Sequence, residues 1–228
     1  MTLVLVAHGS RDPVGGTVVR RIAASLRERL AGVSVRVAFA DVARPTLGEV
    51  LRRVRGPAVV VPAFLAAGYH VRVDLPGQIA ASERPDAVVT PALGPHPALV
   101  AAAAERLRVA GRRPGDAIVL AAAGSSDPRA LGDVRRAALL LEAWTGERVR
   151  TAFITTSRPR VEDVVAELRA EHQRVVISSW LLAPGVFHRA LVGSGADAVA
   201  DPLGAHPRVV DLVVRRYVDA RFSGDRAA

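Results

Sequence analysis

The sequence contains no cysteine, which excludes disulfide bonds, thiolate nucleophiles, zinc ribbons and iron–sulfur clusters. It also contains no lysine: all 31 basic residues are arginine, so there is no P-loop lysine and no Schiff-base chemistry. Long apolar runs are missing as well. The first, Leu3–Ala7, is five residues long, far below the roughly 20 needed to span a bilayer. We therefore expect a cytoplasmic protein with no secretory signal and no membrane segment.

Aromatic residues are also scarce, at 4% of the chain, and the arginines are scattered along it. A stacking surface for single-stranded nucleic acid is therefore not predicted. The formal net charge is +9, which favours an anionic partner. Because the guanidinium group pairs bidentately with carboxylates and phosphates, we expect a small polycarboxylate or phosphate ligand rather than nucleic acid.

The chain repeats itself. Four blocks recur in the same order: 3–13 as 118–128, 35–45 as 149–159, 59–65 as 175–181, and 93–97 as 203–207. The spacing between copies is far longer than a solenoid period, so we infer a gene duplication. The join is predicted in the turn-rich segment 110–115. This gives a first lobe of residues 1–112 and a second lobe of residues 113–228.

Short β-branched runs alternate with longer amphipathic stretches rich in alanine and arginine. Strands are predicted near 3–7, 34–39, 58–62, 86–89, 117–122, 148–154, 174–178 and 197–199. Helices are predicted near 14–31, 46–54, 72–83, 97–110, 129–144, 160–171, 186–193 and 207–221. Alternating strands and helices with short connections predict an α/β fold of parallel sheets. We expect two duplicated flavodoxin-like lobes, each a four-stranded parallel sheet with helices on both faces, and a cleft between them.

A histidine at the end of the opening strand distinguishes the two copies. The first ends its opening strand with His8, whereas the second has Ala123 at that position. Both continue with Gly-Ser-x-Asp-Pro, which predicts a tight turn followed by a helix start, with Asp12 initiating the helix. Since both lobes need the turn and only one has the histidine, His8 is the better functional candidate. The alternative is a buried histidine bonded to the turn.

Two more candidates follow neighbouring strands. His70 lies in the segment 68–76, after the third strand, and a doubly wound sheet places the first and third strands side by side. His8 and His70 are therefore expected to face each other, and two neutral imidazoles suit a divalent first-row transition metal. Asp41, after the second strand, could add a carboxylate. The alternatives are a loop residue or helix cap for His70 and a solvated turn residue for Asp41.

Three other histidines are weaker candidates. His96 and His206 occur in Gly-x-His-Pro turns of both lobes, which indicates a structural role. His188 is roughly the counterpart of His70 in the second lobe. Because Ala123 offers it no partner, we expect His188 to contribute less as a metal ligand.

At these residues the chain resembles the sirohydrochlorin chelatases, the class II, ATP-independent chelatases of sirohaem and cobalamin synthesis, in their long form with two fused lobes. The matching segments are 8–11, 39–45 and 64–76. The resemblance implies that His8 and His70 handle the metal, assisted by Asp41 where the family often has glutamate. The second lobe has Ala123 and Thr155 at the corresponding positions, so a single site is implied, in the first lobe.

The resemblance implies a tetrapyrrole polycarboxylate, sirohydrochlorin, as substrate. Five residues are expected to bind it: Ser10, Arg11, Arg44, Tyr69 and Arg72. The implied reaction is the insertion of Fe²⁺ or Co²⁺ with release of two protons, the metal being a substrate and no nucleotide being used. The sequence leaves the metal, nickel included, and the pathway open. With both lobes in one chain we expect a monomer, without nucleic-acid or membrane partners.

Two other functions fit parts of the pattern. A tetrapyrrole or metal carrier on the same scaffold would keep the two histidines without turnover. A histidine phosphatase would also place His-Gly after an apolar strand, but that class has an arginine directly before the nucleophilic histidine, where this chain has Ala7. Since phosphate needs a preset cationic clamp, the phosphatase is the weaker alternative.

Overall fold

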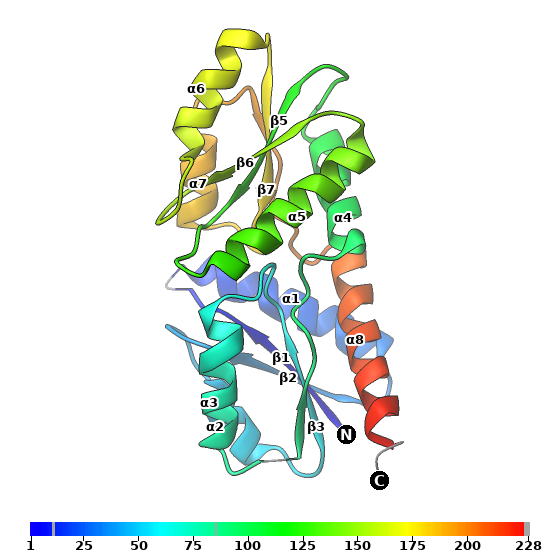
Figure 1. Cartoon of the computed structure of the whole chain (residues 1–228). Coiled ribbons are helices and arrows are strands. Elements are labelled where there is room, and N and C mark those ends of the chain that lie inside the picture. The colour runs from blue at the N-terminus through cyan, green and yellow to red at the C-terminus, as the bar shows by residue number, and fades with distance from the viewer. Residues whose placement is uncertain (11, 85, 226–228) are drawn as a thin grey trace.

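The computed structural model describes residues 1–10, 12–84 and 86–225. It contains two four-stranded parallel sheets, ordered β2-β1-β3-β4 and β6-β5-β7-β8 (Figure 1). The strands are β1 (Thr2–Ala7), β2 (Ser34–Phe39), β3 (Ala58–Pro62), β4 (Ala87–Val89), β5 (Ala117–Ala122), β6 (Val149–Phe153), β7 (Val175–Trp180) and β8 (Ala198–Val199). The predicted α/β fold with two parallel sheets is confirmed.

Helices flank the sheets. They are α1 (Pro13–Arg29), α2 (Leu47–Arg53), α3 (Leu75–Ala80), α4 (Pro97–Val109), α5 (Pro128–Thr145), α6 (Val161–Glu171), α7 (Val186–Val192) and α8 (Pro207–Asp225). A π-helical turn, η1 (His70–Asp74), leads into α3, so this helical segment begins two residues before the predicted start at 72. Within the described part of the chain, no helix is long and apolar enough to cross a membrane.

Both faces of each sheet are covered. Along β1, Leu3 and Leu5 pack with α1 in the largest core cluster, whereas Val4 and Val6 pack with α2 on the opposite face. This follows from the two-residue period of a strand, which turns successive side chains to opposite faces. A parallel sheet buried on both faces needs continuous apolar strands, as the opening run Leu3–Ala7 provides.

The repeated Gly-Ser-x-Asp-Pro motif starts a helix in each lobe. The side chain of Asp12 accepts a hydrogen bond of 3.0 Å from the backbone nitrogen of Val14. In the second lobe, the side chain of Asp127 accepts one of 2.9 Å from the backbone nitrogen of Arg129. In both helices proline follows the cap, where its missing N–H costs no hydrogen bond. The predicted helix initiation is confirmed in both copies.

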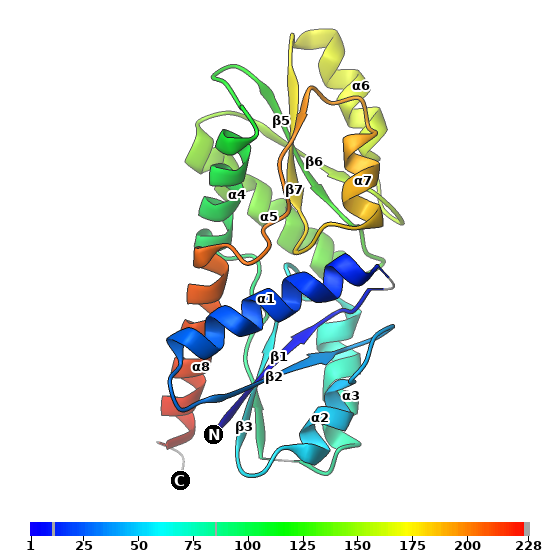
Figure 2. The same cartoon turned by 180° about the vertical axis from the view of Figure 1, so that it is seen from behind.

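The last helix of each lobe packs on the sheet of the other lobe. Helix α4 lies against β7 and α5, whereas α8 lies against β3, β4 and α1 (Figures 1 and 2). Matching contacts accompany this exchange: Arg106 of α4 donates to the Leu203 carbonyl, and Arg216 of α8 donates to the Ala92 carbonyl, both at 3.4 Å. The two lobes therefore share one core cluster. The predicted boundary between the lobes, at residues 112 and 113, describes the sequence repeat and stays a prediction.

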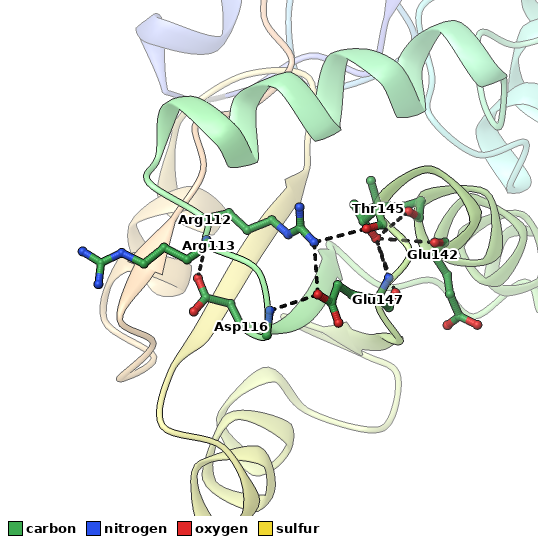
Figure 3. Close-up of polar contacts among 8 residues, drawn as sticks. Arg112, Arg113, Asp116, Glu142, Thr145 and Glu147 are labelled. Carbon is green, nitrogen blue, oxygen red and sulfur yellow. Dashed lines mark hydrogen bonds and ion pairs between the residues drawn. The ribbon is translucent and has the colours of Figure 1, made fainter.

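The segment that joins the lobes is tied to the end of α5 (Figure 3). Arg112 donates to the Thr145 carbonyl at 3.3 Å and lies 3.7 Å from the Glu147 carboxylate. The backbone nitrogen of Arg113 donates to Asp116 at 2.8 Å, which closes the turn before β5. These contacts fix the path of the chain between α4 and the second sheet.

His96 and His206 cap the two exchanged helices, as their shared turn predicts. Nδ1 of His96 accepts from the backbone nitrogen of Ala98 at 3.1 Å, and Nδ1 of His206 accepts from Arg208 at 3.2 Å. Burial lowers the pKa of both histidines. For His96 the nearby arginines, including Arg216, lower the pKa further, whereas for His206 the Glu105 carboxylate opposes the shift.

These caps make stability depend on pH. Because both pKa values are lowered in the folded protein, their contribution is complete above about pH 6.5 and is lost as pH falls through the lowered values. We expect H96N and H206N to flatten the fall of Tm between pH 7 and pH 5, since asparagine caps a helix without titrating. Thermal melting monitored by circular dichroism checks this. H172N, at an exposed position after α6, is the control. An unchanged pH profile in H96N/H206N would contradict the explanation.

Candidate functional site

The site lies at the carboxyl ends of the central strands of the first sheet. His8 follows β1, Asp41 follows β2, and His70 follows β3, which pairs directly with β1. The ring centroids of His8 and His70 are 4.3 Å apart, with the ring planes inclined at 70°. The predicted proximity of the two histidine rings is therefore confirmed.

The turn after β1 brings Asp41 close to His8. The Asp41 backbone nitrogen donates to the His8 carbonyl at 3.0 Å. Gly9 has a φ of +99° and lies so close that a Cβ atom would collide with the Asp41 carbonyl oxygen. Glycine is thus required twice over, by its left-handed backbone and by this close approach.

His8 is held in its neutral form. Although His8 is exposed as a residue, partial burial of its ring is the largest cause that lowers its pKa, and the neighbouring His70 lowers it further. The Asp41 carboxylate acts in the opposite direction, because it favours the imidazolium ion. The net shift is downward, so at pH 7 the imidazole of His8 carries a free lone pair.

His70 is oriented by a carboxylate that the sequence analysis did not single out. Nδ1 of His70 lies 2.5 Å from Oδ2 of Asp74, four residues further along η1. A carboxylate only accepts, so Nδ1 carries the proton and Nε2 keeps its lone pair. Both side chains are partly buried. The sequence contains one signal for this contact: His70 and Asp74 are four residues apart, and residues with this spacing are neighbours on a helical segment.

An open cavity of about 580 Å³ is lined by Asp41, Asp74 and Gln78 among others, and neither histidine is among its lining residues. Oδ1 of Asp41 accepts from the Val42 backbone nitrogen at 2.7 Å. In residues 1–10, 12–84 and 86–225, no group of three or more His, Asp or Glu side chains is arranged to hold a metal ion. His8 and His70 therefore form a pair that leaves room for other ligands, and the role of Asp41 as a metal ligand stays a prediction.

Four of the five residues expected to bind substrate belong to the histidine segments, namely Ser10, Arg11, Tyr69 and Arg72. Arg11 lies outside the described residues. Ser10 is exposed, and its hydroxyl oxygen accepts from the Asp12 backbone nitrogen at 3.0 Å. Tyr69 is exposed, with its ring centroid 6.4 Å from that of His70. Ser10 and Tyr69 thus lie next to the histidine pair in the chain and are open to a ligand.

The two remaining arginines both have protein partners. Arg44 forms an ion pair with Glu49 and is otherwise open to solvent. Arg72 donates from Nε to the Ala67 carbonyl at 2.8 Å, and it lies 4.0 Å from the Asp127 carboxylate of the second lobe. Arg72 therefore connects the His70 segment to the other lobe. Their binding of substrate carboxylates stays a prediction.

The second lobe lacks the pair. Ala123 occupies the position of His8, and the Thr155 hydroxyl donates to the Ala123 carbonyl at 2.8 Å, so this corner holds neither an imidazole nor a carboxylate. His188, on α7, has a buried Nε2 for which the described residues supply no hydrogen-bond partner. The structure thus places His8 next to His70 in the first lobe, whereas Ala123 gives His188 no such partner in the second.

A family model described as CbiX matches residues 2–110 and residues 117–220, so it covers both lobes. The curated relatives include the sirohydrochlorin cobaltochelatase of Methanosarcina acetivorans, 34% identical over 86 residues. That alignment covers 36% of this chain and 66% of the relative. The corresponding protein of Methanopyrus kandleri is 38% identical over 80 residues, which cover 33% of this chain and 56% of the relative. The chain therefore spans between 56% and 66% of the length of these relatives.

Solved structures match the whole fold. SirB from Bacillus subtilis with Fe³⁺ has a TM-score of 0.81 at 22% identity, covering 96% of this chain and 94% of the other. A structure described as CbiX, the terminal enzyme for biosynthesis of siroheme in denitrifying bacteria, has a TM-score of 0.74 at 26% identity, covering 96% and 99% of the two chains. Both similarities extend over the two lobes.

The electrostatics of the pair can be measured directly. We expect the pKa of His8 to lie below the ordinary histidine value. H70A is expected to raise it by removing the neighbouring imidazole that disfavours a charge on His8, whereas D41N is expected to lower it further. Titration of the His8 ring protons by NMR checks both directions. A lower His8 pKa in H70A, or a higher one in D41N, would contradict the assigned causes.

Proposed function

Because the chain belongs to the CbiX family, we propose that it is a sirohydrochlorin chelatase, which inserts Fe²⁺ or Co²⁺ into sirohydrochlorin without ATP. The observation that carries this proposal is the contact between the His8 and His70 rings, whose centroids are 4.3 Å apart at the sheet edge. Neutral imidazoles are good ligands for divalent first-row metals. Two of them leave coordination positions for the nitrogens of the incoming tetrapyrrole.

The same imidazoles suit the proton chemistry. Metal insertion exchanges two pyrrolic N–H protons for one divalent ion, so the reaction needs a base close to the metal. The lowered pKa of His8 keeps its ring neutral at pH 7, ready to bind metal. After the metal leaves, His8 can accept a proton, and the neighbouring Asp41 carboxylate stabilises the imidazolium ion.

The mechanism also needs a bent substrate. A planar tetrapyrrole hides its nitrogen lone pairs in the ring, whereas a ring held bent against the histidine edge presents them to the metal. We assign the peripheral carboxylates of the substrate to the exposed polar groups around the pair, namely Ser10, Arg11, Arg44, Tyr69 and Arg72. Arginine suits this role because its planar fork matches a carboxylate.

We propose that one chain forms the complete site as a monomer. The exchange of α4 and α8 supports this, because each lobe already supplies a helix to the other sheet. The choice between iron and cobalt depends on geometry and metal supply. Relatives of this chain are named as cobaltochelatases, and structures of similar fold are described with Fe³⁺ or with cobalt.

The proposal predicts a specific pattern of activity. Purified protein with sirohydrochlorin and Fe²⁺, Co²⁺ or Ni²⁺, kept anaerobic and without ATP, is expected to accelerate the absorption change of metal insertion. H8A and H70A are each expected to lose most of this activity, whereas H188A keeps most of it because His188 lacks a second imidazole. If the protein accelerates the insertion of none of these metals, the chelatase proposal is wrong. Binding of tetrapyrrole or metal without turnover identifies a carrier instead.

Asp74 provides a second test, because it sets the orientation of His70. Loss of a carboxylate bonded to a ligating histidine typically weakens metal binding by about 10- to 100-fold. We expect D74A to weaken Co²⁺ binding to the substrate-free protein by about this factor. D74N, which keeps an acceptor for Nδ1–H, is expected to lose less. Calorimetric titration with Co²⁺ measures both variants, and equal affinity in D74A and wild type would contradict the role of Asp74.

A further inference from the structure

Several contacts between the lobes occur as matched pairs, one for each copy of the repeat. The N-terminal cap of α1, Asp12, lies 3.0 Å from Arg189 of the second lobe. Its counterpart in α5, Asp127, lies 4.0 Å from Arg72 of the first lobe. Such pairs are expected from duplication, because equivalent positions meet across the interface. They say nothing about why only one lobe has a histidine pair.

Two other contacts between the lobes have no such counterpart. Oδ2 of Asp133, on α5, accepts from the Ala67 backbone nitrogen at 2.9 Å. Nε1 of Trp180, at the end of β7, donates to the Leu65 carbonyl at 3.3 Å. Both side chains belong to the second lobe, and both bind the backbone of the segment that links β3 to His70.

The repeat shows that these contacts are specific to one lobe. When the alignment of the first block is continued into the helices that follow, Val18 takes the position of Asp133; the third block places Phe64 at the position of Trp180. Neither side chain has an atom that accepts or donates a hydrogen bond, so neither can make the reciprocal contact. The second lobe thus has polar groups where the first has apolar ones, and these groups are directed at the loop that carries a histidine.

Close packing leaves this loop little freedom. A Cβ atom added at Gly68 would lie 3.4 Å from Cβ of Ala130 on α5, so the loop runs directly along that helix. On its other side, Gly94 approaches Leu65 so closely that any Cβ atom there would collide with the Leu65 backbone. The two hydrogen bonds therefore fix the loop along its backbone, three and five residues before His70.

We propose that Asp133 and Trp180 are positioning residues of the second lobe, which hold the 65–67 backbone so that the His70 ring faces His8. This inference rests on the proposed function, since it assigns the second lobe a part in the reaction of the first. The duplicated lobe is then required for geometry as well as for packing. Neither side chain touches the reacting atoms.

The test replaces each residue with the one its repeat counterpart has. D133V removes the acceptor, and W180F removes the indole N–H while retaining an aromatic ring. We expect each to lower kcat by about 10- to 100-fold, because small misplacements of reacting groups cost about this much. D133N, which can still accept from Ala67, is expected to remain within about threefold of wild type. D211N, which breaks the Arg29–Asp211 ion pair between α1 and α8, is the matched control and is expected to leave kcat unchanged.

A readout independent of activity is the nuclear Overhauser contact between the His8 and His70 ring protons. We expect it in wild type, D133N and D211N, and expect it weakened in D133V and W180F, with circular dichroism confirming that each is folded. Wild-type kcat and an intact ring contact in folded D133V or W180F would overturn the proposal. If wild-type protein inserts no metal, the proposed function fails, and the ring contact alone decides whether Asp133 and Trp180 position His70. If D133V does not fold, kcat and the ring contact of W180F decide the question in its place.

Discussion

The parallel pairing of β1 with β3 is the constraint on which the site depends. Val6 is in register with Pro62, and the Ala63 backbone nitrogen donates to the Val6 carbonyl at 2.7 Å, so the two strands end together. The next residues along each chain segment leave the sheet at the same edge. His8 and His70, 62 positions apart in the sequence, become neighbours for this reason.

The two lobes share a duplicated scaffold, and the histidine proposed to bind the metal occurs where the two copies differ. Each lobe keeps the glycine turn and the aspartate cap, because a strand that turns into a helix needs both. The first lobe adds His8, whereas the second has Ala123. The second lobe contributes helix α8 to the core of the first, and the first lobe contributes α4 to the core of the second. Two lobes packed in this way cannot separate without exposing that shared core, which gives the histidine loops a rigid support.

Much of this arrangement could be predicted from the sequence, because it follows from local periodicity. The strands, the helix starts at Asp12 and Asp127, and the cap role of His96 depend on residues within a few positions of one another. The His8–His70 contact followed once a doubly wound order was assumed. The helix exchange could not be predicted, since a short connection does not specify which sheet the next helix covers. Asp74 was overlooked, because the contact is visible only once His70 is placed on a helical turn.

The most direct measurement of the central claim is the coordination of a metal bound to the substrate-free protein. X-ray absorption spectroscopy of the Co²⁺-loaded chain counts imidazole ligands through their characteristic outer-shell scattering. We expect two imidazoles in wild type and one in H8A or H70A, with H188A unchanged. A cobalt ion with no imidazole ligand in wild type, or with the same ligands in H8A, would contradict the claim that His8 and His70 hold the metal together.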